Sequence, residues 1–108
     1  MRPEWIDAVK RAWERDRGRA SVAVQRNQLP MPARDAWDQL EKEPVAAGTP
    51  GAARKTGAVR FSVEGKNVFA VTRPDDAGAL RVHLYDAAGH LVASGESDEG
   101  GSRWIGRN

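Results

Sequence analysis

Four side chains in the second half of the sequence have the chemistry of a hydrolytic site. Arg81, His83 and Tyr85 alternate along one segment, and His90 follows after a short turn. Two imidazoles beside a guanidinium and a phenol suit metal-independent phosphodiester cleavage, as general acid, general base and charge stabiliser. No spacing motif fixes these roles, and a solvated sheet face carries the same residue types. The four are therefore candidate catalytic residues of a small ribonuclease, but we favour the surface interpretation.

A second set of residues suits contact with another protein. Tryptophan and arginine are enriched among the residues that contribute most to protein interfaces. Trp104 beside Arg103, close to the C-terminus, is the best candidate for an exposed aromatic anchor, although we favour packing of Trp104 on the sheet. The partner-binding candidates are Trp104, Arg103, Arg81 and Tyr85.

A basic run in the first half could follow a phosphate backbone. Its members are Lys10, Arg11, Arg15, Arg17, Arg19 and Arg26. Glu14 and Asp16 interrupt it, and residues 1–56 carry eleven Lys or Arg against eight Asp or Glu, a weak positive footprint. A helix-turn-helix over residues 7–28 conflicts with Gly18 and Pro30. Nucleic-acid binding is therefore the alternative function and not the first.

Other site chemistries find no support in the sequence. The chain has no cysteine, so it has no disulfide and no zinc–thiolate site. Two histidines with Asp86 are too few for a metal centre. Gly48, Gly51 and Gly57 belong to a linker and do not form a phosphate-binding loop between a strand and a helix. We predict no metal and no cofactor, and no motif ties the sequence to a known family.

Helices are predicted in the N-terminal half. Ile6, Val9 and Trp13 form an apolar stripe at helical spacing over residues 3–17, and Gly18 is a natural end. Residues 19–26 fit a short strand or a continued helix. A second helix is expected over residues 32–42, with an apolar face formed by Ala33, Ala36, Trp37 and Leu40.

The C-terminal half alternates as an antiparallel meander does. Strands are expected over residues 58–64, 67–73, 79–85 and 90–94, with a possible last strand over 103–105. A Gly65-Lys66 turn would place Val63 opposite Val68 and Phe61 opposite Ala70. The strand 67–73 is then apolar on both faces, which indicates a central strand with cover on both sides.

The last hairpin carries the candidate catalytic group. A four-residue turn over 86–89 would pair Tyr85 with His90, Leu84 with Leu91, and Val82 with Ala93. Because side chains alternate along a strand, this pairing puts the apolar ones on one face. It gathers the four candidate catalytic residues on the other face, namely Arg81, His83, Tyr85 and His90.

These elements predict one α+β domain over residues 1–108, in which two short amphipathic helices pack on a four- to five-stranded antiparallel meander sheet. Its parts are a helical half 1–43, a linker 44–57 and a meander 58–106. The sequence has a net charge of +2 and no membrane segment or signal peptide, so a cytoplasmic protein is expected.

Small size and the absence of catalytic motifs favour a non-catalytic regulatory module that binds another protein by stoichiometric surface occlusion. An inhibitor, an immunity-type or phage-encoded antagonist and an accessory subunit all fit this description. A homodimer through an exposed edge of the last strand is a further expectation.

Overall fold

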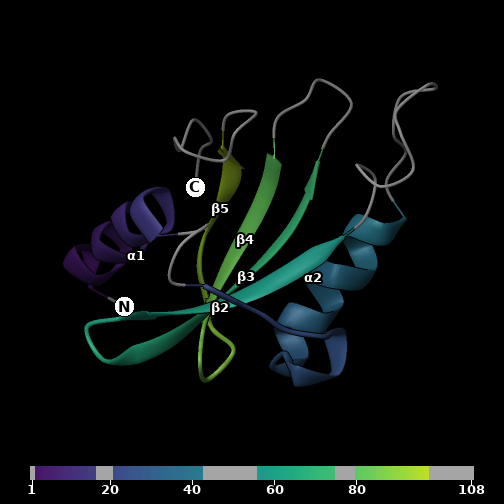
Figure 1. The fold of residues 1–108 in the computed structure, drawn as a ribbon, viewed down its shortest axis with the longest axis horizontal. Helices are drawn as coiled ribbons and strands as arrows, with labels where there is room; N and C mark the ends of the chain where they lie inside the picture. Colours follow the sequence, from purple (N-terminus) through teal and green to yellow (C-terminus); the bar gives the residue numbers. More distant parts are fainter. Residues whose placement is uncertain (1, 17–20, 43–55, 75–79, 98–108) are drawn as a thin grey trace.

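A computed structural model describes residues 2–16, 21–42, 56–74 and 80–97 of the chain. Five strands form one antiparallel sheet in sequence order, and the two helices cover its opposite faces (Figure 1). This arrangement confirms the predicted α+β fold. In chain order the elements are α1 (Pro3–Asp16), β1 (Val22–Ala23), the 3₁₀ helix η1 (Arg26–Gln28), α2 (Met31–Glu41), β2 (Gly57–Val63), β3 (Lys66–Pro74), β4 (Leu80–Asp86) and β5 (Leu91–Ser97).

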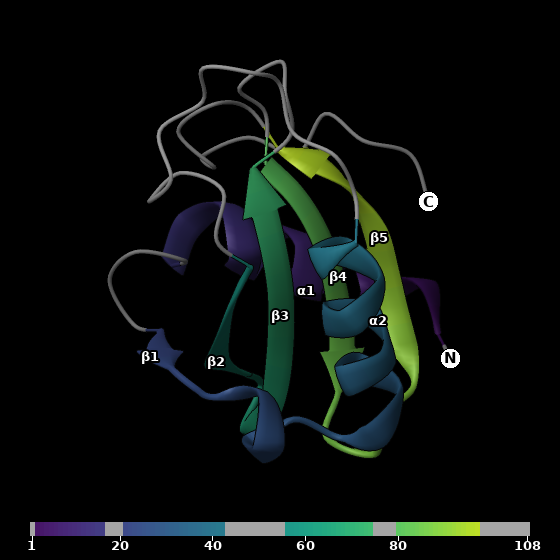
Figure 2. The same cartoon turned by 90° about the vertical axis from the view of Figure 1, so that its right-hand side faces the viewer.

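The segment that fitted either a strand or a helix contains the short strand β1. Val22 pairs with Arg60 and Ala23 pairs with Val59 of β2, so β1 covers only part of the β2 edge. The chain then passes through η1 to α2, and Figure 2 shows α2 in front of the sheet with α1 behind it. No helix in the described ranges is long and apolar enough to cross a membrane.

The core consists of two apolar layers, one on each face of the sheet. On the α1 side, Val9 and Trp13 pack with Phe61, Val68 and Leu84. On the α2 side, the buried set is Leu29, Ala33, Ala36, Leu40, Ala58, Val71 and Tyr85. Because β3 contributes to both layers, it is the central, doubly covered strand that the sequence predicted.

The turn between β2 and β3 differs from the prediction. Glu64 and Gly65 form it, with positive φ angles of 52° and 79°, as a type I′ turn requires. Lys66 already belongs to β3 and lies opposite Val63. We expected glycine first in the turn, but Glu64 occupies that position in the left-handed conformation, which a side chain with a Cβ adopts only at a cost.

This turn shifts the pairing of β2 with β3 by two residues. Val63 lies opposite Lys66 instead of Val68, and Phe61 lies opposite Val68 instead of Ala70. The predicted register was therefore wrong. The predicted faces are nevertheless correct, because side chains alternate with a period of two and a shift of two keeps each one on its side.

The pairing of β4 with β5 also differs, by one residue at Tyr85, next to the turn, and by a second residue beyond a bulge in β5. The observed pairs are Tyr85 with Leu91, Leu84 with Ala93 and Val82 with Gly95, in place of the expected Tyr85–His90, Leu84–Leu91 and Val82–Ala93. Val92 is the additional residue. It is buried, whereas Leu91, expected in the core, is 52% exposed.

Strand β2 begins inside the segment 44–57 that was predicted to be a linker. Gly57 is the first residue of β2, and the buried Thr56 donates its hydroxyl to Glu41 Oε2 at 3.0 Å. The same carboxylate lies 3.2 Å from Nη1 of Arg73, which also donates to the Leu40 carbonyl at 2.6 Å. These contacts fix the C-terminal end of α2 on the sheet.

A candidate binding groove

Arg81, His83 and Tyr85 share one face of β4, as predicted, and this is the face that α2 covers. Tyr85 is buried in the α2-side layer, and burial raises the pKa of its phenol, with the nearby Asp35 adding to the effect. Burial also lowers the pKa of His83, and the Arg81 guanidinium lowers it further. The imidazole therefore favours its neutral form.

His90 does not join these three residues, which corrects the predicted four-residue cluster. Tyr85 pairs with Leu91, so His90 lies in the β4–β5 turn, and its side chain is exposed there. Its backbone N–H donates to Asp86 Oδ1 at 2.8 Å, and its Nδ1 lies 3.2 Å from Asp86 Oδ2. His83 sits in mid-strand opposite Ser94. The two imidazoles accordingly occupy different environments and do not form one acid–base pair.

The predicted basic run is divided between the two faces of the sheet. Lys10, Arg11 and Arg15 belong to α1, while Arg26 belongs to η1 beside α2. Arg17 and Arg19 lie outside the described residues. The structure therefore does not bring the described members of the run together as one track for a phosphate backbone.

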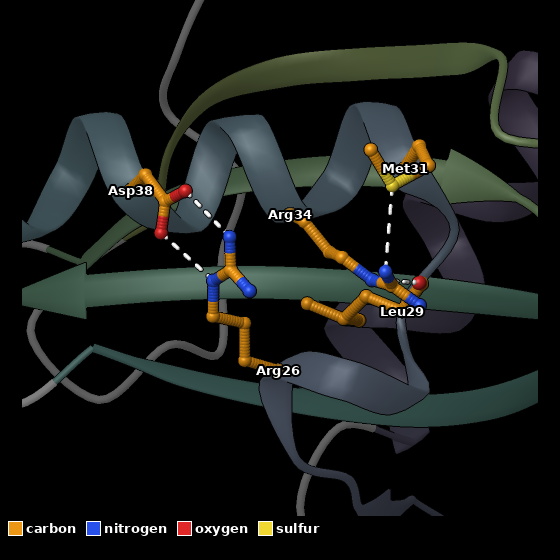
Figure 3. Close-up of polar contacts among 5 residues, drawn as sticks. All are labelled: Arg26, Leu29, Met31, Arg34 and Asp38. Atoms are coloured by element: carbon orange, nitrogen blue, oxygen red, sulfur yellow. Dashed lines mark hydrogen bonds and ion pairs between the residues drawn. The ribbon is translucent and has the colours of Figure 1, made fainter.

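Arg26 is also committed to an ion pair. Its Nε and Nη2 donate to the two carboxylate oxygens of Asp38 at 2.8 and 2.6 Å (Figure 3). This pair raises the pKa of Arg26 and lowers that of Asp38. In the same region Arg34 donates to the Leu29 carbonyl at 2.9 Å and contacts Met31 Sδ at 3.4 Å, so both arginines hold η1 against α2.

Two further predicted residues, Arg103 and Trp104, lie outside the described residues, and so does the predicted strand over 103–105. Within the described ranges there is no group of three or more His, Asp and Glu side chains that could hold a metal ion.

An open groove with a volume of about 860 Å³ lies where three chain segments meet. The N-terminal end of α1, the β2–β3 turn and the β4–β5 turn form its walls. The residues that line it are Arg2, Trp5, Glu64, Lys66, Asn67, Asp86, Ala87, Ala88 and His90.

The groove combines an aromatic wall with a cation. The half-buried Trp5 packs against the α1-side core, and the Lys66 ammonium lies 5.4 Å from the centroid of its ring. Because its indole is anchored in the core, Trp5 presents a fixed apolar surface to the groove. Arg2 is exposed at the start of the same helix.

Both turns that line the groove are held by local geometry. In the β4–β5 turn, the Gly89 N–H donates to the Asp86 carbonyl and the Asp86 N–H donates to the His90 carbonyl, each at 3.0 Å. Gly89 also packs closely on Pro32 and Pro30. The β2–β3 turn is closed by the pairing of Val63 with Lys66. The groove therefore has preformed walls.

The sequence predicted Trp5 in the core and His90 beside His83, and it did not indicate this groove. Its lining comes from positions 2–5, 64–67 and 86–90, which are far apart in the chain. The sequence contained one indication of the groove, because Trp5 lies close to Arg2 at the predicted start of the first helix. Comparison with known proteins gives no relative to guide the assignment: no family model, curated protein or solved structure matches the chain.

Proposed function

We propose that this chain is a small non-catalytic module that binds another protein and occludes part of its surface. The groove between the α1 N-terminus and the two turns is the contact site, and it is the observation that carries this proposal. Its volume lies within the range of about 300–1,000 Å³ that is usual for small-molecule pockets, so it has room for side chains of a partner. Being open, it can accept side chains that project from the surface of a partner.

The make-up of the groove supports this role. Trp5 offers a large aromatic surface that is already ordered by the core, so little side-chain entropy is lost on binding. Arg2, Lys66 and Asn67 provide polar groups around it that can orient a partner. A central apolar contact with a polar rim is the usual composition of a protein interface.

The separation of His83 from His90 also favours binding over catalysis. General acid–base cleavage requires both groups within reach of one substrate bond. His83 is on the α2 side in mid-strand, whereas His90 lines the groove beside Trp5. We also propose that the partner is cytoplasmic, since a chain without cysteine needs no oxidising compartment to fold.

The test is an affinity pull-down from lysate of the native host, with and without nuclease, using two charge-reversal variants. Lys66→Glu changes the groove, whereas Arg11→Glu changes an exposed residue of α1 that does not line it. We expect a protein that survives nuclease treatment, binds the wild type and Arg11→Glu equally, and is lost with Lys66→Glu. Circular dichroism of each variant checks that the fold is retained.

Two results would contradict the proposal. A protein partner that binds Lys66→Glu as well as the wild type would show that the contact lies elsewhere. Recovery of nucleic acid alone, lost on nuclease treatment and weakened in Arg11→Glu, would replace the proposal with nucleic-acid binding. Such binding would also fall steeply with salt.

A further inference from the structure

We infer that the groove selects a partner segment that carries a carboxylate next to an apolar side chain. This inference rests on the proposed function, because it names the chemistry that the same groove recognises. It follows from which charges of the groove are already neutralised within the chain and which are left for a ligand.

The two full positive charges of the groove lie on different walls. Arg2 comes from the start of α1 and Lys66 from the start of β3, and both side chains are exposed. Neither has a carboxylate partner among the described residues; the contact of Lys66 is with the Trp5 ring. A carboxylate between these walls would gain a charge-assisted contact from each.

The α1 N-terminus adds to this positive character. The first backbone N–H groups of a helix carry a partial positive charge, which favours an anion nearby. Glu4 is the acidic residue of that first turn, but it does not line the groove. The helix end, Arg2 and Lys66 therefore act in the same direction.

The two acidic residues of the groove are not equivalent. The Asp86 carboxylate already has a partner within the chain. Its Oδ1 accepts from the His90 backbone N–H at 2.8 Å, and its Oδ2 lies 3.2 Å from His90 Nδ1. Glu64, at the rim, has no partner among the residues that the structure describes. It opposes an incoming carboxylate, so removal of its charge should strengthen binding.

The apolar residues that line the groove determine which apolar side chains of the ligand fit there. Trp5 provides one face, and the methyl groups of Ala87 and Ala88 lie in the opposite turn. Leucine-sized side chains bury apolar surface against such a wall. An acidic segment with apolar neighbours therefore matches the groove better than a purely acidic one.

The experiment titrates three synthetic peptides into ¹⁵N-labelled full-length protein and follows amide and Trp5 indole shifts by NMR. The probes are acetyl-Leu-Asp-Leu-Glu-Leu-amide, its uncharged isostere acetyl-Leu-Asn-Leu-Gln-Leu-amide, and acetyl-Leu-Lys-Leu-Lys-Leu-amide. We expect the acidic peptide to bind about tenfold more tightly than the isostere at low salt, with shifts at Trp5, Lys66 and His90. High salt should reduce the difference in affinity between the acidic peptide and its isostere.

Three variants sharpen the test. Lys66→Glu should weaken the acidic peptide about threefold or more, and Glu64→Gln should strengthen it about twofold to threefold, as expected for exposed charge pairs. Arg11→Glu, outside the groove, should leave the affinity unchanged. The opposite signs at positions 64 and 66 distinguish local recognition from a loss of folding.

Equal binding of the acidic peptide and its isostere, or tighter binding of the basic peptide, would overturn the inference. So would shifts that map to the basic residues of α1, or no shift in the groove with any peptide. Groove binding without charge preference would leave the proposed function standing. Conversely, acidic selectivity with no groove-dependent protein partner in the pull-down would refute the proposed function and leave only the charge preference of the groove.

Discussion

The close packing of the β4–β5 turn on the start of α2 gives the most direct test of the fold around the groove. Gly89 has a φ of 93°, and a Cβ added there would lie 3.0 Å from Pro32 Cδ and 3.3 Å from Pro30 Cβ. Gly65 in the β2–β3 turn has a similar φ of 79°, but no described heavy atom lies within 4 Å of its added Cβ. The two glycines form a matched pair.

The expected costs follow from these two environments. Gly65→Ala should lower the free energy of unfolding by about 1–2 kcal/mol, the cost of a left-handed backbone for a residue with a Cβ. Gly89→Ala should carry the same backbone cost and a further cost of about 1–3 kcal/mol, because the rings of Pro30 and Pro32 are rigid and must be displaced. The total for Gly89→Ala is therefore about 2–5 kcal/mol.

Urea unfolding followed by tryptophan fluorescence measures both variants against the wild type. Similar slopes for the three proteins would show that the variants change stability and not the extent of unfolding. If Gly89→Ala costs no more than Gly65→Ala, the turn does not pack on the two prolines, and the description of this wall of the groove is wrong. A cost at Gly65 near zero would refute the backbone part of the reasoning.

Three further predictions concern stability. Glu64→Asn should raise the free energy of unfolding by about 0.5–1 kcal/mol in the same assay, because Asn-Gly is the preferred type I′ sequence; a loss would contradict that turn. Leu84→Ala should cost about 2–5 kcal/mol and Leu91→Ala about 0.5 kcal/mol or less, since the first is fully buried and the second exposed; equal costs would argue against the bulge in β5. Burial and Arg81 lower the pKa of His83 in the folded protein. The unfolded chain therefore binds a proton at His83 more readily than the folded one does. As a result, the free energy of unfolding decreases as the pH falls below about 6.5. His83→Gln should therefore lose less stability than the wild type between about pH 7.5 and pH 5.5, and an equal loss would exclude this role.

Several features of the fold could be predicted because they depend on local periodicity. The stripe of Ile6, Val9 and Trp13 indicated α1, and the alternation in residues 58–73 indicated β2 and β3. The two-sided apolar pattern of β3 also predicted that both faces of the sheet are covered. Even the wrong register of the first hairpin kept the faces correct, since the error was two residues and side chains alternate with a period of two.

The second hairpin shows where this reasoning stops. Its alternating pattern was compatible with a regular pairing, and nothing local required an extra residue at Val92. The bulge lets Val92 and Ala93 both reach the core and leaves Leu91 exposed. That choice depends on how the α1 side of the sheet fills, which is a property of the packed domain and not of the segment.

The sequence by itself therefore determined the fold class, the main elements and the side of the sheet to which most side chains point. Only the tertiary structure decided the candidate site. Trp5, Lys66 and His90 belong to three segments with no local relation, and they meet because two turns and a helix start lie at one end of the same sheet. Local propensity depends on neighbours along the chain, whereas a groove depends on long-range packing and register.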